Sequence, residues 1–140
     1  MTALRYLLDT NICIYIAKQR PPVVAQRFAE HSVGEVGMSL VTFGELRFGA
    51  EKSARRSEAL VTLTHFAELI PVVELDAAVG ETYGVLRAHL ERKGTPIGNN
   101  DLWIAAHARR LGVILVSNNL REFERVPELK LENWARTGYP

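Results

Sequence analysis

Tyr6-Leu7-Leu8-Asp9-Thr10-Asn11 is the stretch that decides the fold of this 140-residue chain. A short apolar run with the composition of a buried strand ends in a carboxylate, and a helical pattern from Asn11 to Lys18 follows at once. The sequence therefore predicts a strand from Leu4 to Leu8. Asp9 then stands at the carboxyl end of that strand, where open α/β sheets bind their ligands.

Short apolar segments and helical segments alternate through the rest of the chain. Further strands are expected at Glu35–Leu40, Pro71–Leu75, Val113–Ser117 and near Lys130–Leu131. Further helices are expected at Val23–Ala29, Val41–Lys52, Ser57–Leu69, Asp76–Lys93 and Asp101–Leu111, with a short one after Asn119. This alternation predicts an α/β fold, in which a parallel central sheet of about five strands carries helices on both faces. The length suits a single domain, which we assign to residues 1–140.

The composition excludes several classes of protein. A hydrophobic content of 47% with 24% charged residues is that of a folded globular chain. The net charge of only +1 means that any contact with nucleic acid must be a local patch. Cys13 is the only cysteine, which excludes a disulfide within the chain and fits a reducing compartment. We find neither a signal peptide nor an apolar segment of membrane-spanning length, and expect a cytoplasmic protein that does not bind membranes.

Three carboxylates, Asp9, Glu45 and Asp101, stand where the local pattern favours an apolar or small residue. Asp9 follows a strand, Glu45 lies on the helix face between Val41 and Phe48, and Asp101 opens an apolar helix. Carboxylates that are forced together repel, and a divalent cation with oxygen ligands relieves that repulsion. Such a site supports metal-assisted hydrolysis of phosphate esters.

Each carboxylate also has a purely structural explanation. Asp9 or Thr10 can cap the helix that follows it. Glu45 can reach solvent or pair with Arg47 or Lys52. Asp101 can be stabilised by the helix dipole alone, behind a cap formed by Asn99-Asn100.

A fourth polar position, Ser117-Asn118-Asn119, follows the most apolar of the predicted strands. Asparagines in turns are commonly present for backbone reasons. If this strand lies beside the first one, however, its end faces Asp9 at the point where the strand order reverses.

Four blocks of the sequence together resemble the signature blocks of PIN-domain ribonucleases and, more closely, the VapC toxins of bacterial toxin-antitoxin pairs. They are Leu7–Asn11, Phe43–Ser53, Asn100–Ala108 and Val116–Pro127. They occur in the family's order, and the resemblance extends from Leu4 to Trp134. It implies a PIN-like fold and a Mg²⁺-dependent endoribonuclease, for which Mn²⁺ can substitute.

The resemblance also assigns the site residues. Asp9, Glu45 and Asp101 carry over as catalytic, metal-binding carboxylates, and Asn119 occupies the place of a fourth acid in many PIN domains. An amide is a weaker, neutral ligand, although Glu122 can lend charge nearby. Hydroxyl or amide groups suited to holding ligands or water next to the metal are those of Thr10, Asn11, Ser117 and Asn118.

The expected reaction is attack by a metal-activated water on a phosphodiester, which leaves a 5′-phosphate and a 3′-hydroxyl. VapC-like toxins act on structured RNA, often transfer RNA, which is recognised largely by shape. We expect Arg87, Lys93, Arg109 and Arg121 to contact the RNA, although exposed basic residues are more commonly solvated helix faces.

The resemblance implies protein partners as well. VapC-like proteins usually form homodimers and are inhibited by a VapB-type antitoxin. They contact DNA only indirectly, through that antitoxin. Large apolar side chains on the expected helix pair, among them Phe43, Phe48 and Phe66, either complete the core or form the groove for that antitoxin.

Two other functions remain open at this point: a catalytically weak PIN module that binds RNA or a partner, suggested by Asn119, and a phosphoacceptor domain. The phosphoacceptor is disfavoured because Asn11 stands where such domains carry a second acid.

Overall fold

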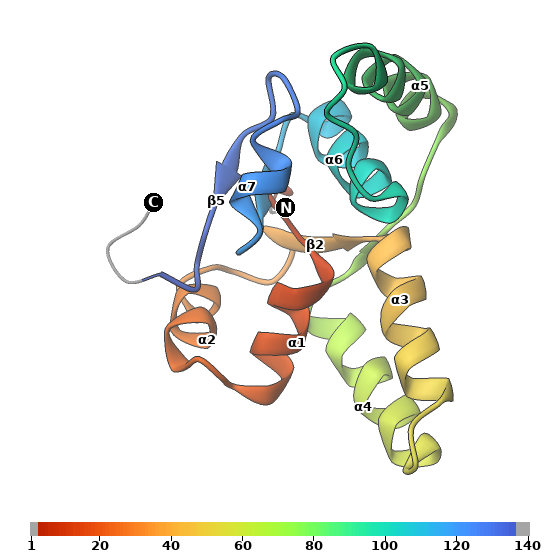
Figure 1. The fold of residues 1–140 in the computed structure, drawn as a ribbon. Helices are drawn as coiled ribbons and strands as arrows, with labels where there is room; N and C mark the ends of the chain where they lie inside the picture. Colours follow the sequence, from red (N-terminus) through yellow and green to blue (C-terminus); the bar gives the residue numbers. More distant parts are fainter. Residues whose placement is uncertain (1–2, 137–140) are drawn as a thin grey trace.

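A computed structural model describes residues 3–136 of the chain, and its centre is a parallel sheet. Five strands pair in the order β3-β2-β1-β4-β5, every neighbouring pair in parallel (Figure 1). They are β1 (Tyr6–Leu8), β2 (Val36–Ser39), β3 (Val72–Val73), β4 (Ile114–Val116) and β5 (Leu131–Glu132). The five-stranded parallel sheet predicted from the sequence is therefore confirmed.

Helices fill the connections between these strands. The first four are α1 (Thr10–Lys18), α2 (Pro22–Ala29), α3 (Leu40–Glu51) and α4 (Arg56–Leu69). The remaining three are α5 (Ala77–Arg92), α6 (Asn99–Leu111) and α7 (Leu120–Phe123). Each expected helix is present, with its bounds shifted by two residues or fewer. Helices α3 and α4 form an antiparallel pair that extends away from the sheet (Figure 1).

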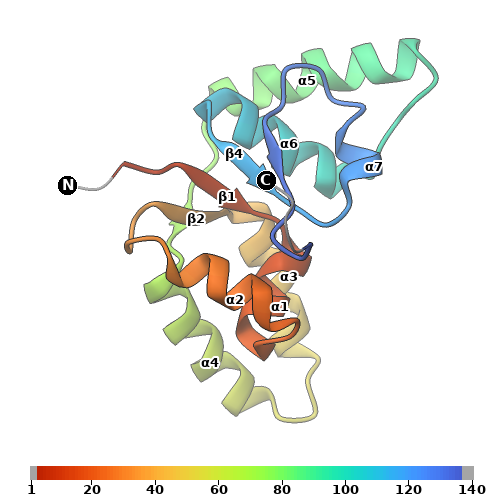
Figure 2. The same cartoon turned by 90° about the vertical axis from the view of Figure 1, so that its left-hand side faces the viewer.

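The two faces of the sheet carry separate apolar layers because side chains alternate along a strand. Leu7 and Leu115 lie on one face, where they pack with α5, α6 and the segment that follows α7. Tyr6, Leu8 and Met38 lie on the other, with α1, α2 and parts of α3 and α4. Figure 2 shows α5 and α6 on one side of the strands and α1 to α4 on the other. A sheet covered on both faces explains why its strands read as uninterrupted apolar runs.

The order of the strands reverses next to β1, since the chain passes from β1 to β2 on one side and later returns to β4 on the other. The carboxyl ends of β1 and β4 are therefore adjacent, and the backbone N–H of Asp9 donates to the carbonyl of Val116 at 3.0 Å. A crevice at such a reversal is where open α/β sheets bind ligands. No helix within residues 3–136 has both the length and the apolar character needed to cross a membrane.

Candidate active site

Asp9 lies directly after β1 and is almost fully buried, with 5% of its surface exposed. Its Oδ1 accepts a hydrogen bond from the backbone N–H of Ile12 at 3.0 Å, so it is the N-cap of α1, one of the two caps considered from the sequence. Burial raises the pKa of Asp9 to about 6, against the opposing effect of hydrogen bonds from the Ser117 hydroxyl and Ile12. The charge of Glu45 raises it further. Capping alone therefore does not account for Asp9, because its carboxylate is also electrostatically coupled to a second acid.

Glu45 projects from α3 toward the start of α1. The hydroxyl of Thr10 donates to its Oε1 at 2.6 Å. Neither of the alternative partners considered from the sequence binds it: Arg47 pairs with Glu51 at 2.7 Å, and Lys52 lies over the ring of Phe48. Phe48 itself is 64% exposed, so the expectation of a buried helix face between Val41 and Phe48 is wrong on the side of Phe48. The reason is that α3 extends beyond the edge of the sheet.

Asp101 lies in the first turn of α6 and is half-buried. The expected cap by Asn99 and Asn100 is wrong, because both residues already belong to the helix and Gly98 is the N-cap, without a side-chain hydrogen bond. Helix α6 thus begins two residues earlier than predicted. Asp101 is therefore the third residue of the helix, still in its first turn, where its carboxyl group lies near other acids.

Glu122 of α7 is the residue that the assignment by sequence did not place in the catalytic set. Its carboxyl group lies beside that of Asp101. Its Oε1 accepts from the backbone N–H of Gly98 at 2.8 Å, and its Oε2 accepts from Nδ2 of Asn119 at 2.6 Å. Burial raises the pKa of Asp101 to about 7, followed by the charge and hydrogen bond of Glu122 and then by the charges of Asp9 and Glu45. The four acids therefore form one electrostatically coupled group.

The residues after β4 hold this group in place. Ser117 is buried, and its Oγ accepts from the backbone N–H of Asn119 at 2.9 Å in addition to its bond with Asp9. Asn118 is exposed, and its Nδ2 donates to the hydroxyl of Tyr15 at 2.8 Å. Asn11 is exposed in the first turn of α1. Ser117 and Asn119 thus contact members of the acidic group, whereas the contact that the structure shows for Asn118 is with Tyr15.

The four basic residues expected to contact RNA occupy different regions. Arg121 lies on α7 next to Glu122, and Arg87 and Lys93 are exposed on the last two turns and the C-cap of α5. Arg109 lies in the last turn of α6, at the opposite end from Asp101, and pairs with Glu128 at 3.1 Å. Since a helix rises about 1.5 Å per residue, Arg109 is roughly 12 Å along the axis from Asp101. Its role stays a prediction from sequence.

The donor set suits a hard cation. Among residues 3–136, no three His, Cys, Asp or Glu side chains lie close enough together to form a complete metal site. Mg²⁺ does not require such a cage, because it commonly uses one or two carboxylates and retains several waters. Carboxylates with raised pKa values, surrounded by hydroxyl and amide groups, provide oxygen ligands of the kind that this ion prefers.

Comparison with known protein sequences gives matches over nearly the whole chain. A family model described as the PIN domain matches residues 6–129. Ribonuclease VapC2 of Haemophilus influenzae (strain KW20) is 44% identical over 132 residues, which cover 94% of this chain and 99% of that protein. The tRNA(fMet)-specific endonuclease VapC of Shigella flexneri is 45% identical over 132 residues, with shares of 94% and 99%.

Solved structures match equally well. VapBC-1 from nontypeable Haemophilus influenzae superposes with a TM-score of 0.88 at 35% identity, covering 95% of this chain and 100% of that one. DNA-bound VapBC from Salmonella typhimurium also gives a TM-score of 0.88, at 40% identity, with 94% and 98% covered.

Proposed function

This chain belongs to the PIN-domain family and is a ribonuclease of the VapC type, and on that premise we propose that it is a Mg²⁺-dependent endoribonuclease toxin. In this proposal it cuts structured RNA to leave a 5′-phosphate and a 3′-hydroxyl. The observation that carries the proposal is the electrostatic coupling of Asp9, Glu45, Asp101 and Glu122, which come from four different elements. Mutual repulsion among clustered acids destabilises a fold, and clusters of this kind are typical of functional sites.

Asp9, Glu45 and Asp101 would hold the Mg²⁺ ion, or Mn²⁺ in its place, with one or two of the carboxylates bound directly and the remainder through water. When bound, the ion supplies Lewis acidity and neutralises charge at the scissile phosphate. The raised pKa values of Asp9 and Asp101 support this assignment, because both carboxylates are costly to ionise without a cation.

The surrounding residues orient the acids before substrate arrives. Ser117 and the N–H of Ile12 fix Asp9, and Thr10 fixes Glu45. Asn119 donates to Glu122, which makes the amide a positioning group and Glu122 the fourth acid of the site. Groups held in this way lose little freedom when they bind a ligand.

Transfer RNA is the proposed substrate class. The Shigella flexneri relative is named a tRNA(fMet)-specific endonuclease. Arg87, Lys93 and Arg121 are exposed on elements that flank the acids, and contacts from such residues would position a structured RNA. A site of this kind fits a small local basic patch, in agreement with the net charge of +1.

An apolar groove between α1, α3 and α4 is the proposed binding surface for a VapB-type antitoxin. It has a volume of about 560 Å³ and is lined by apolar side chains that include Ile14, Leu46, Leu63 and Phe66. Thr10 and Glu45 also line it, so a segment lying in the groove would reach the acidic site. The structural relatives described as VapBC support such a partner. We further propose that the protein acts in the cytoplasm as a homodimer and contacts DNA only through the antitoxin.

Brief expression in bacteria followed by sequencing of RNA 5′ ends tests the proposal. New 5′-phosphate ends at a few positions in transfer RNA are expected for the wild-type protein and not for Asp9→Asn. With purified protein, EDTA should abolish cleavage and Mg²⁺ should restore it. Cleavage that persists in EDTA, or in Asp9→Asn, would overturn the metal-dependent mechanism.

A further inference from the structure

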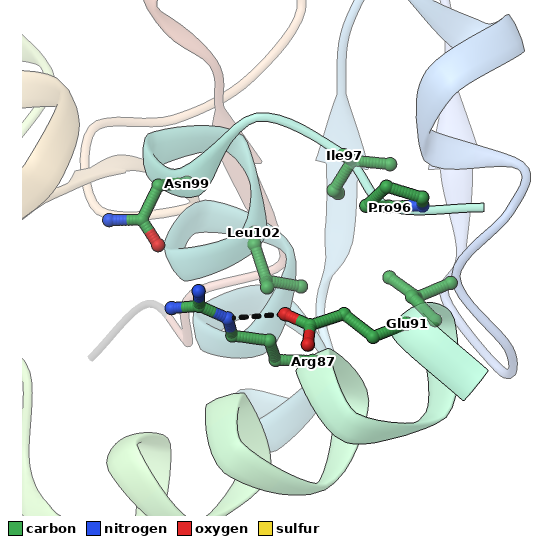
Figure 3. A pocket seen from close by; sticks show the side chains of 7 residues that line it. Arg87, Glu91, Pro96, Ile97, Asn99 and Leu102 are labelled. Atoms are coloured by element: carbon green, nitrogen blue, oxygen red, sulfur yellow. Dashed lines mark hydrogen bonds and ion pairs between the residues drawn. The ribbon is translucent and has the colours of Figure 1, made fainter. Parts of the chain in front are cut away.

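A small pocket lies between α5, α6 and the loop that joins them. Its volume is about 130 Å³. Seven residues line it: Arg87, Leu90, Glu91, Pro96, Ile97, Asn99 and Leu102. Figure 3 shows Arg87 and Glu91 projecting from α5, Asn99 and Leu102 projecting from α6, and Pro96 and Ile97 on the loop between them.

The pocket combines apolar and polar surfaces. Leu90 and Leu102 are buried core residues, and Pro96 and Ile97 add further apolar surface. Arg87, Glu91 and Asn99 are exposed and offer both hydrogen-bond donors and acceptors. The volume corresponds to about four water molecules, well below that of a pocket that encloses a small-molecule ligand. Only part of a larger molecule, such as one planar ring with a polar edge, would fit.

The polar side chains of the pocket are held in position by a network. The rings of Tyr83 and Trp103 stack, with centroids 3.8 Å apart and planes 11° apart. The Tyr83 hydroxyl donates to Oδ1 of Asn99 and accepts from Nη1 of Arg87 at 3.0 Å. Arg87 also donates through Nε to Glu91 at 2.8 Å (Figure 3). A preorganised rim of this kind reduces the entropy lost when a ligand binds.

The same loop also contacts the acidic site. Pro96 and Ile97 line the pocket, and the next residue, Gly98, donates its N–H to Glu122. A Cβ atom on Gly98 would lie 3.6 Å from the carboxylates of both Asp101 and Glu122. Arg125 additionally donates to the carbonyl of Pro96 at 2.9 Å. Only the backbone of the loop at Ile97 and Gly98 therefore lies between the pocket and the catalytic acids.

We propose that this pocket binds one unstacked nucleobase of the RNA, next to the bond that is cut. The inference rests on the proposed ribonuclease function and adds a subsite that recognises the substrate. Sequence-specific binding of RNA loops commonly uses splayed-out bases, which stack on aromatic or guanidinium planes and offer their edges for hydrogen bonding. Arg87 would contact the base, and Tyr83 would act as a positioning residue.

The test uses the anticodon stem-loop of initiator tRNA, synthesised as a set with the fluorescent base 2-aminopurine at one loop position at a time. Binding is measured with the Asp9→Asn protein in Mg²⁺, because this variant should leave the RNA uncut. One position should change its fluorescence on binding, and adding Arg87→Leu should abolish that change and weaken binding about tenfold. Tyr83→Phe, which keeps the stack but removes the hydroxyl, should give a smaller loss.

Arg47→Leu is the matched control. Arg47 pairs with Glu51 four residues on, as Arg87 does with Glu91, and their side chains are 51% and 55% exposed. The Arg47 variant should behave as the wild type. Equal binding and fluorescence in the Arg87 and Arg47 variants, while the wild type still cleaves RNA, would overturn the base pocket and leave the ribonuclease intact. A wild-type chain that neither binds nor cuts RNA would overturn both.

Discussion

The carboxyl group of Glu122 in α7 lies close to that of Asp101 in α6, where its charge and hydrogen bonding add to burial in raising the pKa of Asp101. Two carboxyl groups can share a hydrogen bond only if one of them is protonated. The contact forms because α7 begins directly after the turn at the end of β4, while Gly98 and Asn119 donate to the two oxygens of Glu122. Before metal binds, the raised pKa of Asp101, about 7, therefore favours a proton shared between these two groups.

The first prediction concerns which residue is the fourth acid. Glu122→Gln should lower the rate of RNA cleavage by at least about tenfold, since it removes a charge that couples directly to Asp101. Asn119→Ala should have a smaller effect because it removes only a group that orients Glu122. Initial rates at saturating Mg²⁺ compare the two variants. A larger loss of cleavage rate in Asn119→Ala than in Glu122→Gln would indicate that Asn119, and not Glu122, occupies the fourth position of the site.

The second prediction concerns the pH dependence of stability without metal. The pKa of Asp9 rises from 3.8 in the unfolded reference to about 6 in the fold, so the native state binds more protons between these values. The free energy of unfolding contributed by this group therefore falls as pH rises through that range, by up to about 3 kcal/mol.

Asp9→Asn lacks this ionisation and keeps an oxygen that can accept from Ile12 as the cap of α1. In EDTA the variant should be more stable than the wild type at pH 8, and the difference should shrink toward pH 4. Urea unfolding at several pH values measures both. A wild-type protein that is as stable as the variant at pH 8 would contradict the raised pKa.

Much of this architecture follows from sequence because each strand is short, apolar and bounded by a polar residue. The α/β class, the parallel sheet and the PIN-like fold are all confirmed. Asp76, expected as the first residue of its helix, is instead the N-cap of α5, and Ser39 is the N-cap of α3, since each side chain accepts from the start of its helix. Strand ends differ, for example at β3, because an edge strand pairs on one side only, and only Val72 and Val73 do so.

The sequence pointed to Asp9, Glu45 and Asp101 as candidate site residues, but not to Glu122 or to the arrangement of the four acids. Asp9 and Asp101 stand at strand or helix ends, where the sequence pattern itself draws attention to them. Glu122 was harder to assign because it lies on a helix surface, where an acid normally faces solvent. A signal did exist, since Asn119 and Glu122 are three residues apart and therefore lie on the same side of a helical turn. Its contact with Gly98 depends on a loop whose path no local pattern encodes.

The third prediction tests a buried contact between Ser39, the N-cap of α3, and His107 of α6. Helix α3 carries Glu45, and helix α6 carries Asp101. Ser39 Oγ accepts from the N–H of Val41 at 3.2 Å and lies 2.9 Å from Nδ1 of His107. Burial lowers the pKa of His107, which is consistent with a neutral ring. Ser39→Ala removes a helix cap and leaves a buried imidazole nitrogen without its partner, so it should cost about 2–4 kcal/mol of unfolding free energy.

Ser57→Ala, at an exposed position on α4, is the control and should change the unfolding free energy by less than about 0.5 kcal/mol. Chemical denaturation at one pH measures both variants. Similar values for the two serines would show that the Ser39–His107 contact does not stabilise the fold.

The last prediction concerns proton release on metal binding. Asp9 and Asp101 have pKa values of about 6 and about 7, so at pH 6.5 part of the population carries protons that must leave when Mg²⁺ binds. Calorimetric titration in two buffers with different ionisation enthalpies should therefore give different apparent enthalpies. The difference should shrink at pH 8.5, where both groups are already ionised.

Glu122→Gln should also reduce the difference between the two buffers at pH 6.5, because removal of the neighbouring charge lowers the pKa of Asp101. Buffer-independent heats at pH 6.5 would mean that the carboxyls bind metal without losing protons, and absence of any heat at millimolar Mg²⁺ would favour a PIN module that binds RNA or a partner without cutting.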